Sequence, residues 1–241
     1  MSLKANIDEK LTTLAGTEFT YIETSDISKA NEIDYGCTGI YLEATIIYFE
    51  IKNMAFILKE NGRRKMAQIY TMFREVLSAI AEADGGFVNC YSPESILVVY
   101  PGKENNTKNA VKSAIKISTF LSEALKTKFG NITGLEFGMG MDHGHIMGTK
   151  NLSDNGIECL TWFGTSILKA KSICRECARP YYLGISSVIY HGLDEELLIT
   201  IKRILGIKKR VELWTKVSYQ YENNKKHLYQ TNHRIALDDA Q

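Results

Sequence analysis

The sequence lacks any apolar stretch close to the roughly 20 residues that a membrane-spanning helix needs, and no signal-peptide pattern opens it. It also lacks an excess of either charge: 29 Lys and Arg residues stand against 28 Asp and Glu residues, for a net charge of +1. This balance gives no reason to expect nucleic acid or a membrane surface as a partner. Cysteine is sparse and odd in number, with five residues in 241, which fits a reducing compartment better than a disulfide framework. Together these absences predict a cytoplasmic protein.

The remaining composition is that of an ordinary globular protein. A hydrophobic share of 44% in 241 residues is enough for a sizeable core, and the length favours one large domain with an N-terminal extension. We expect an extension or cap over residues 1–43, the main domain over 44–217 and a polar tail over 218–241. Cys174 and Cys177 have C-x-x-C spacing. Because no second Cys/His pair lies at metal-ligand spacing, we interpret this spacing as coincidence at a helix end.

The chain is organised around a short apolar run at residues 45–51, which ends on Glu50 and Ile51. Both faces of this run are hydrophobic and rich in β-branched and aromatic residues, which is typical of a buried strand. A carboxylate there is costly unless it is paired or binds a cation. Alternatively, Glu50 only marks the point where the strand leaves the core for solvent.

A second stretch, residues 85–100, reads as strand, tight turn and strand, with Pro93 and polar residues at the bend. If this hairpin pairs beside the first strand, Glu94 at its tip lies near Glu50. Two neighbouring carboxylates repel each other, and a divalent cation such as Mg²⁺ relieves that repulsion.

Two long amphipathic helices are predicted over residues 62–83 and 107–127. Their inward stripes follow spacings of three and four: Met66, Ile69, Phe73, Leu77 and Ile80 in the first, and Val111, Ala114, Ile115, Phe120, Leu121 and Leu125 in the second. The resulting βαββαβ order predicts an α+β, ferredoxin-like sandwich. We also expect a short helix over 6–15, an extended segment over 17–22, a loop over 25–35 and a late strand over 211–217.

Four segments, in this order, carry a family resemblance that covers residues 44–190. Residues 48–51 stand in the place of a Phe-x-Asp-Ile strand end, and residues 85–100 in that of a Gly-Gly…Gly-Asp-Gly hairpin followed by an apolar strand. Residues 138–148 resemble a glycine-rich hairpin, and residues 162–172 a helix of Gly-x-x-(apolar)-Asn-x-Ala-x-Arg type. The sequence thus resembles the catalytic domain of class III adenylate and guanylate cyclases.

That resemblance implies a reaction and a set of site residues. Class III cyclases bring the 3′-hydroxyl of a nucleoside triphosphate onto its own α-phosphorus with two metal ions, Mg²⁺ or Mn²⁺, held by two aspartates. The metal positions fall on Glu50, Ile51 and Glu94, with Glu where the family has Asp. The base-reading positions fall on Cys90 and Thr161, and neither matches an adenine or guanine pattern. The turn after the strand, which offers N–H groups to the triphosphate, lacks its usual glycine, although Lys52 and nearby amides could serve.

The largest departures fall on the last of the four segments. The ribose-orienting Asn of the family maps onto Leu168, and its transition-state Arg onto Ser172. Leu has no polar side-chain atom and Ser cannot replace a guanidinium. Loss of such a positioned charge costs on the order of a thousandfold in rate. Lys169 and Lys171 are each one position away, rotated about 100° from the required face, and we interpret them as solvated.

These departures predict a degenerate cyclase homology domain, a pseudoenzyme of cyclic-nucleotide signalling. It would act as a regulatory, nucleotide-sensing or dimerisation module. The alternative is a divergent active cyclase that uses Mg²⁺ or Mn²⁺ on the two glutamates. The resemblance also implies head-to-tail dimers with the active sites at the interface. The expected partners are therefore a nucleoside triphosphate and either a second copy or another cyclase-type domain.

Overall fold

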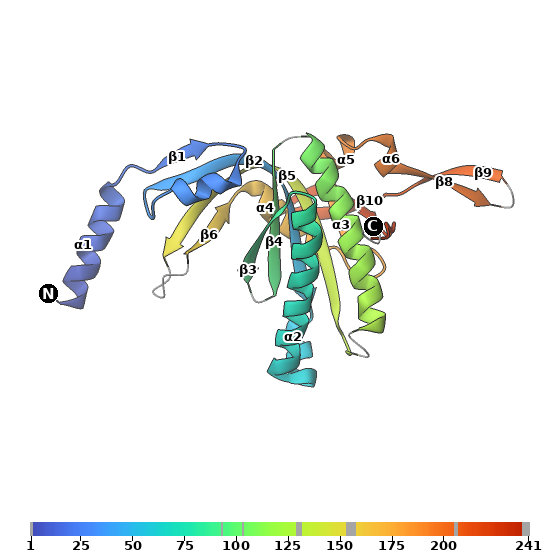
Figure 1. The fold of residues 1–241 in the computed structure, drawn as a ribbon, viewed down its shortest axis with the longest axis horizontal. Helices are drawn as coiled ribbons and strands as arrows, with labels where there is room; N and C mark the ends of the chain where they lie inside the picture. Colours follow the sequence, from blue (N-terminus) through green and yellow to red (C-terminus); the bar gives the residue numbers. More distant parts are fainter. Residues whose placement is uncertain are drawn as a thin grey trace.

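A computed structural model describes residues 2–92, 94–102, 104–128, 132–152, 158–204 and 207–237. The helices are α1 (Leu3–Gly16), α2 (Met54–Ala83), α3 (Glu104–Thr127), α4 (Thr165–Arg175), α5 (Ser187–His191) and α6 (Glu195–Leu198), with a 3₁₀ helix η1 (Ile27–Glu32). The strands are β1 (Thr20–Glu23), β2 (Thr38–Lys52), β3 (Phe87–Ser92), β4 (Ser95–Pro101), β5 (Glu136–Leu152), β6 (Glu158–Phe163), β7 (Leu183–Ser186), β8 (Ile199–Ile204), β9 (Ile207–Glu212), β10 (Thr215–Tyr221) and β11 (Asn224–Thr231). Figure 1 shows how they are arranged.

A large mixed sheet forms the centre of the molecule. Its strand order is β10-β11-β7-β5-β2-β4-β3, with β1 added to β2 and β6 added to β5. Within it, β2, α2, β3, β4, α3 and β5 follow the predicted βαββαβ order, and their strands pair antiparallel as β5-β2-β4-β3. This is the strand order of a ferredoxin-like core. The predicted α+β class is therefore confirmed.

Strand β2 is buried on both faces, as its continuous apolar run predicts. Ile47, Phe49 and Ile51 belong to the core beneath α2 and α3. Ile46 and Tyr48 belong to a second core on the opposite face, beneath α4. Strand β2 therefore contributes side chains to both cores. Its C-terminal end, which carries Glu50, emerges between these two cores.

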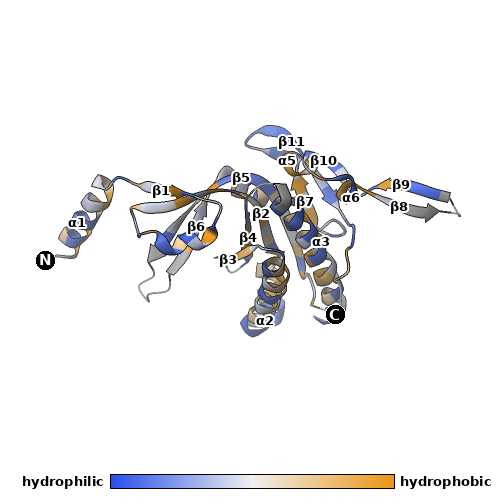
Figure 2. Cartoon of the chain, turned by 45° about the horizontal axis from the view of Figure 1, so that its top comes forward, coloured by the Kyte–Doolittle hydropathy of each residue, from blue (hydrophilic) through white to orange (hydrophobic). Residues whose placement is uncertain are grey.

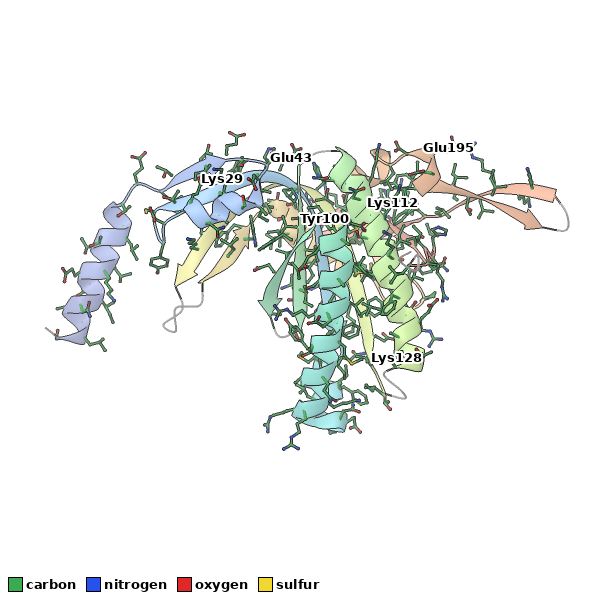
Figure 3. All side chains as sticks on the ribbon, viewed as in Figure 1. Lys29, Glu43, Tyr100, Lys112, Lys128 and Glu195 are labelled. Atoms are coloured by element: carbon green, nitrogen blue, oxygen red, sulfur yellow. The ribbon has the colours of Figure 1, made fainter. Side chains whose placement is uncertain are left out.

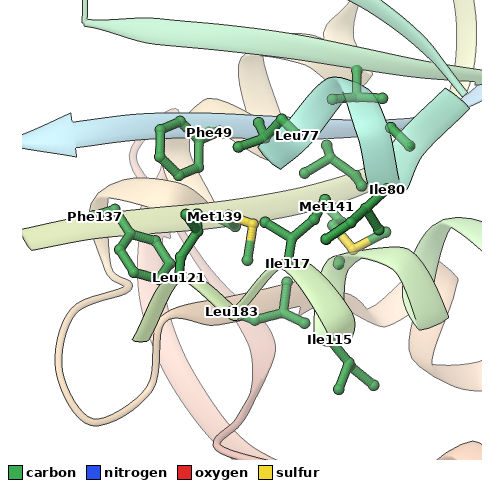
Figure 4. Close-up of a cluster of buried hydrophobic side chains, with 14 of the residues drawn as sticks. Phe49, Leu77, Ile80, Ile115, Ile117, Leu121, Phe137, Met139, Met141 and Leu183 are labelled. Carbon is green, nitrogen blue, oxygen red and sulfur yellow. The ribbon is translucent and has the colours of Figure 1, made fainter. Parts of the chain in front are cut away.

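Helices α2 and α3 cover one face of the sheet, and Figure 4 shows how their apolar side chains meet those of the strands. The predicted stripe of α2, from Met66 to Ile80, is buried. The helix starts earlier than expected, at Met54, and Gly62 interrupts it with non-helical dihedrals. Phe120 was predicted to face inward, but it is 40% exposed; the core of α3 is completed by its neighbours Ile117 and Leu121. In Figure 2 both helices alternate between hydrophobic and hydrophilic residues, as expected for helices with one buried side.

Helix α4 covers the other face and lies unusually close to β5. A Cβ atom added to Gly140 would lie 2.0 Å from the carbonyl oxygen of Ala170 and 2.3 Å from the amide nitrogen of Cys174. The hairpin predicted over residues 138–148 is wrong, because these residues lie within one continuous strand, β5. Its glycines do not turn the chain; Gly138 and Gly140 let the backbone of α4 approach the sheet.

The N-terminal segment extends the sheet and covers part of it. Strand β1 pairs parallel with the start of β2. The loop predicted over residues 25–35 contains η1, and Ala30 and Ile33 are buried in the core that η1 shares with α4. Helix α1 precedes this segment and has no buried residue; in Figures 1 and 3 it stands away from the body with its side chains in the open.

The C-terminal segment adds two hairpins. The late strand predicted over residues 211–217 is divided between β9 and β10. Between them lies Trp214, whose indole Nε1–H donates to the carbonyl of Leu197 at 2.7 Å. The sheet continues past residue 217, since β11 pairs with both β10 and β7. No helix in the described part of the chain is both long and apolar enough to cross a lipid bilayer.

Candidate functional site

The candidate site lies where β2 ends. Glu50 stands opposite Ser95 on β4 and opposite Gly138 on β5. The β3–β4 turn folds back onto this strand end, because the amide of Ile51 donates to the carbonyl oxygen of Glu94 at 2.8 Å. The backbone of Glu94 therefore lies beside the strand end that carries Glu50, while a metal ion shared by the two carboxylates stays a prediction. The Glu94 side chain points into the open, whereas Glu50 is partly buried.

The Glu50 carboxylate already has a cationic partner. Lys52 Nζ lies 3.2 Å from Glu50 Oε2, and the two side chains are only 17% and 21% exposed. The same ammonium group donates to the carbonyl oxygen of Cys174 at 3.0 Å. That carbonyl belongs to the last turn of α4, where the helix dipole favours positive charge. Lys52 is thus directed inward to Glu50 and α4, and not outward as a free phosphate ligand.

The residues at this strand end do not fit a divalent metal ion. Mg²⁺ takes six oxygen ligands at about 2.0–2.1 Å, several of them usually waters or substrate oxygens, and is bound through one or two protein carboxylates. Among the residues that the structure describes, no group of three or more His, Cys, Asp or Glu side chains could hold a metal. Glu50 is engaged by an ammonium group in the place where a cation would bind. At the position where Mg²⁺ or Mn²⁺ was expected, on Glu50, Ile51 and Glu94, the Glu50 carboxylate therefore already has the Lys52 ammonium group beside it.

The turn after β2 keeps a glycine-like geometry without a glycine. Asn53 adopts the left-handed conformation, with φ 58° and ψ 28°, immediately before α2 begins. Asn is the residue that tolerates this conformation best after Gly. Asn53 thus provides, at the turn where the resemblance implies a glycine, a conformation that glycine also adopts readily.

The two positions that the resemblance assigns to base recognition, Cys90 and Thr161, lie on β3 and β6, and a side-chain hydrogen bond joins these strands. The side-chain amide of Asn89 on β3 donates to the carbonyl oxygen of Leu160 on β6 at 3.1 Å. Cys90 and Thr161 each follow one residue later. Thr161 is half-buried on β6, opposite Thr149 on β5. The side chain of Cys90 lies outside the part of the structure that is described.

At the two positions of α4 that the resemblance assigns to Asn and Arg, Leu168 and Ser172, no side chain could stabilise a transition state. Leu168 is 54% exposed, and Ser172 is partly buried. Lys171 Nζ lies over the ring of Tyr48, 5.7 Å from its centroid. Lys171 is therefore not simply solvated, as the sequence suggested, but contacts its own sheet.

One titratable residue of this region was missed by sequence reasoning. Asp142, in the middle of β5, is 1% exposed. Burial raises the pKa of its carboxyl group, while a hydrogen bond with Ser186 and the charge of Lys169 act in the opposite direction. Its Oδ1 atom has no hydrogen-bond partner among the described residues. The sequence signal that could have identified Asp142 is an acidic residue within a run of glycines and methionines, because such a run is otherwise typical of a buried segment.

Comparisons with known proteins identify solved structures with a similar fold, but no related sequence. No protein-family model matches the sequence, and no curated protein sequence matches it. The guanylyl cyclase Cya2 superposes with a TM-score of 0.65 at 12% identity, covering 83% of this chain and 97% of that one. The adenylyl cyclase CyaB from P. aeruginosa gives 0.63 at 14% identity, covering 84% and 99%. A dimeric guanylyl cyclase domain of the RhoGC fusion protein from Blastocladiella emersonii gives 0.58 at 14% identity, covering 80% and 98%. The chain therefore has the fold of an adenylyl or guanylyl cyclase catalytic domain, as the resemblance implied.

Proposed function

We propose that this cyclase-fold domain has lost cyclase activity and acts as a regulatory module that pairs with a second cyclase-type domain. The observation that carries the proposal is on α4, where Leu168 and Ser172 occupy the positions that the resemblance assigns to Asn and Arg. Neither side chain can stabilise negative charge on a reacting phosphate. The rate loss expected from this change alone is on the order of a thousandfold.

An apolar surface at the start of α4 supports the pairing. Phe163, the last residue of β6, is 57% exposed, and Leu168 on α4 is 54% exposed. Large apolar side chains that gather on a surface often mark contact sites, and these two flank the first turn of α4. The guanylyl cyclase domain of the RhoGC fusion protein from Blastocladiella emersonii, which has this fold, has been solved as a non-canonical dimer and, as a double mutant, as a monomer. We infer that Phe163 and Leu168 are covered by the partner domain.

The identity of the partner decides what the pair can do. In a homodimer, both sites would carry the same Leu168 and Ser172 and would be defective in the same way. In a heterodimer with an intact cyclase, the partner would supply its own Asn and Arg to the site formed with this chain. This chain would bring Glu50 and Glu94 to that site from its side of the interface, but with Glu50 already paired to Lys52 it would supply no metal ion, so both shared sites would lack part of the catalytic machinery.

A cyclase assay tests the loss of activity. The purified chain is incubated with ATP or GTP and Mn²⁺, and cyclic product is measured by mass spectrometry beside an intact cyclase domain. We expect at least about a thousandfold less product than from the intact domain. Product from the wild-type chain that disappears in Glu50→Gln would overturn the proposal in favour of a divergent active cyclase. The left-handed conformation of Asn53 at the turn before α2, which a glycine could also adopt, is the observation that favours this alternative.

Light scattering after gel filtration tests the pairing surface. We expect Phe163→Ser to weaken self-association, or association with a co-expressed cyclase domain. Phe120→Ser is the matched control, because Phe120 is also exposed but lies on α3, on the opposite face of the sheet. Equal behaviour of the two variants would argue against this surface.

A further inference from the structure

We propose that the ammonium group of Lys52 is a built-in cation that takes the place of a divalent metal ion at Glu50. The wild-type strand end would then bind no Mn²⁺ or Mg²⁺. Removal of the ammonium group would open a site for a hard divalent cation. The inference concerns the same strand end as the proposed function and extends it, but it is tested by metal binding and not by activity.

The first argument is the position of the ammonium group. It lies between two oxygen atoms, Glu50 Oε2 at 3.2 Å and the carbonyl oxygen of Cys174 at 3.0 Å. One belongs to the carboxylate that the resemblance assigns to metal, and the other to the negative end of the α4 dipole. A partly buried carboxylate requires a positive partner, and Lys52 provides it from two residues along the same strand.

The second argument is the space that the fold leaves for this side chain. Gly138 lies beside the lysine stem on the neighbouring strand, and a Cβ atom there would approach Lys52 Cε to 2.9 Å. The absence of a side chain at Gly138 therefore lets the lysine reach inward. With 17% of its side chain exposed, Lys52 is held in place and is not an ordinary surface lysine.

The third argument is competition. A divalent cation bound to Glu50 would stand next to a fixed positive charge in a partly buried site, where charges are screened less than in water. The metal ion would also have to compete for Glu50 Oε2, which already accepts a hydrogen bond from Lys52. The ammonium group and the metal ion therefore exclude each other, and the covalently attached cation is always present.

Mn²⁺ binding, measured by electron paramagnetic resonance of free Mn²⁺ and by calorimetry without nucleotide, tests the inference. We expect no wild-type binding below millimolar Mn²⁺. In Lys52→Met we expect at least about a tenfold gain in affinity, because the competing charge is gone. The gain should vanish in Lys52→Met/Glu50→Gln, which retains no carboxylate at residue 50. Circular dichroism checks that each variant is folded.

Lys116→Met is the matched control. Lys116 Nζ lies 3.2 Å from Asp84 Oδ2, and these side chains are 28% and 23% exposed, so the pair resembles Lys52 and Glu50 but lies elsewhere in the fold. No gain in Mn²⁺ affinity is expected there. Wild-type binding that is lost in Glu50→Gln, or a folded Lys52→Met that gains no affinity, would overturn the inference. Cyclic product from the wild type would instead contradict the proposed function, so the two can fail separately.

Discussion

The ammonium group of Lys171 on α4 lies over the ring of Tyr48 on β2, 5.7 Å from the ring centroid. Tyr48 is buried, so this cation–π contact ties the outer surface of the helix to the sheet beneath it. Lys169 lies close enough to Asp142 to favour the ionised form of its carboxyl group. Both lysines that flank the mapped positions on α4 therefore interact with their own domain, rather than standing free at the position where the resemblance implies an arginine.

Gly140→Ala should severely destabilise the domain. Its Cβ atom would lie 2.0 Å from the carbonyl oxygen of Ala170, and the backbone of α4 would have to move. We expect a loss of at least about 3 kcal/mol in the free energy of unfolding, measured by urea denaturation. Gly144→Ala is the control on the same strand, because its nearest contact, the Cβ of Ser166, would lie at 3.5 Å. Equal losses in the two variants would contradict close packing at Gly140.

The buried carboxyl group of Asp142 should make stability depend on pH. Burial raises its folded-state pKa above the ordinary value of 3.8. Below pH 3.8 the group is protonated in both states and carries no charge penalty. As the pH rises above 3.8, the unfolded chain releases the proton first, so this group lowers stability until the folded-state pKa is passed.

Asp142→Asn should therefore be more stable than the wild type at neutral pH, by on the order of 1 kcal/mol, and should lose this pH-dependent decline. His143, Lys169, Tyr219 and Tyr221 are the other titratable groups near Asp142 and remain in the variant. Asp84→Asn is the control with the opposite expected sign, since Asp84 is bonded to Ser113 and Lys116. Urea denaturation between pH 4 and 8 measures both. A less stable Asp142→Asn at every pH would refute the prediction.

The C-x-x-C pair should be chemically inert in the folded protein. Cys174 and Cys177 are both buried. Burial raises the pKa of the Cys174 thiol, and it raises that of Cys177 to about 12. Since the thiolate is the reactive form, iodoacetamide at pH 8 should label both at least about a hundredfold more slowly than the half-buried Cys37. Peptide mass spectrometry measures the rates, and guanidinium should abolish the difference. Labelling of all three at one rate in the native protein would show the prediction to be wrong.

Much of the fold was predictable because its signals are local. The apolar run of β2, the polar turn before Ser95 and the stripe from Met66 to Ile80 follow strand, turn and helix periodicities directly. Strand β5 was not predictable in this way, because its four glycines, at 138, 140, 144 and 148, read as turns in the sequence. Their role is set by the α4 backbone and by Trp162, which pack against them.

The candidate site was predictable in position but not in chemistry. The neighbourhood of Glu50 and Glu94 followed from the strand and the hairpin. The ammonium of Lys52 between Glu50 and Cys174 did not, because it depends on a helix end 122 residues further along the chain. The exposure of Phe120 was also missed, because helical spacing identifies an apolar stripe but not its exact limits.

The contact between β5 and α4 also bears on whether the proposed loss of activity could be reversed by a movement of the helix. A latent enzyme can be activated when a helix slides or turns and brings a different residue to the reacting atoms. Here the carbonyl of Ala170 and the amide of Cys174 lie directly against Gly140, so α4 can neither slide nor turn without breaking that contact. A rotation that brought Lys169 or Lys171 to the position of Ser172 would therefore have to break the packing of α4 against Gly140. The proposed loss of activity would therefore lie in the residues of α4 themselves, and not in a position of the helix that a ligand could change.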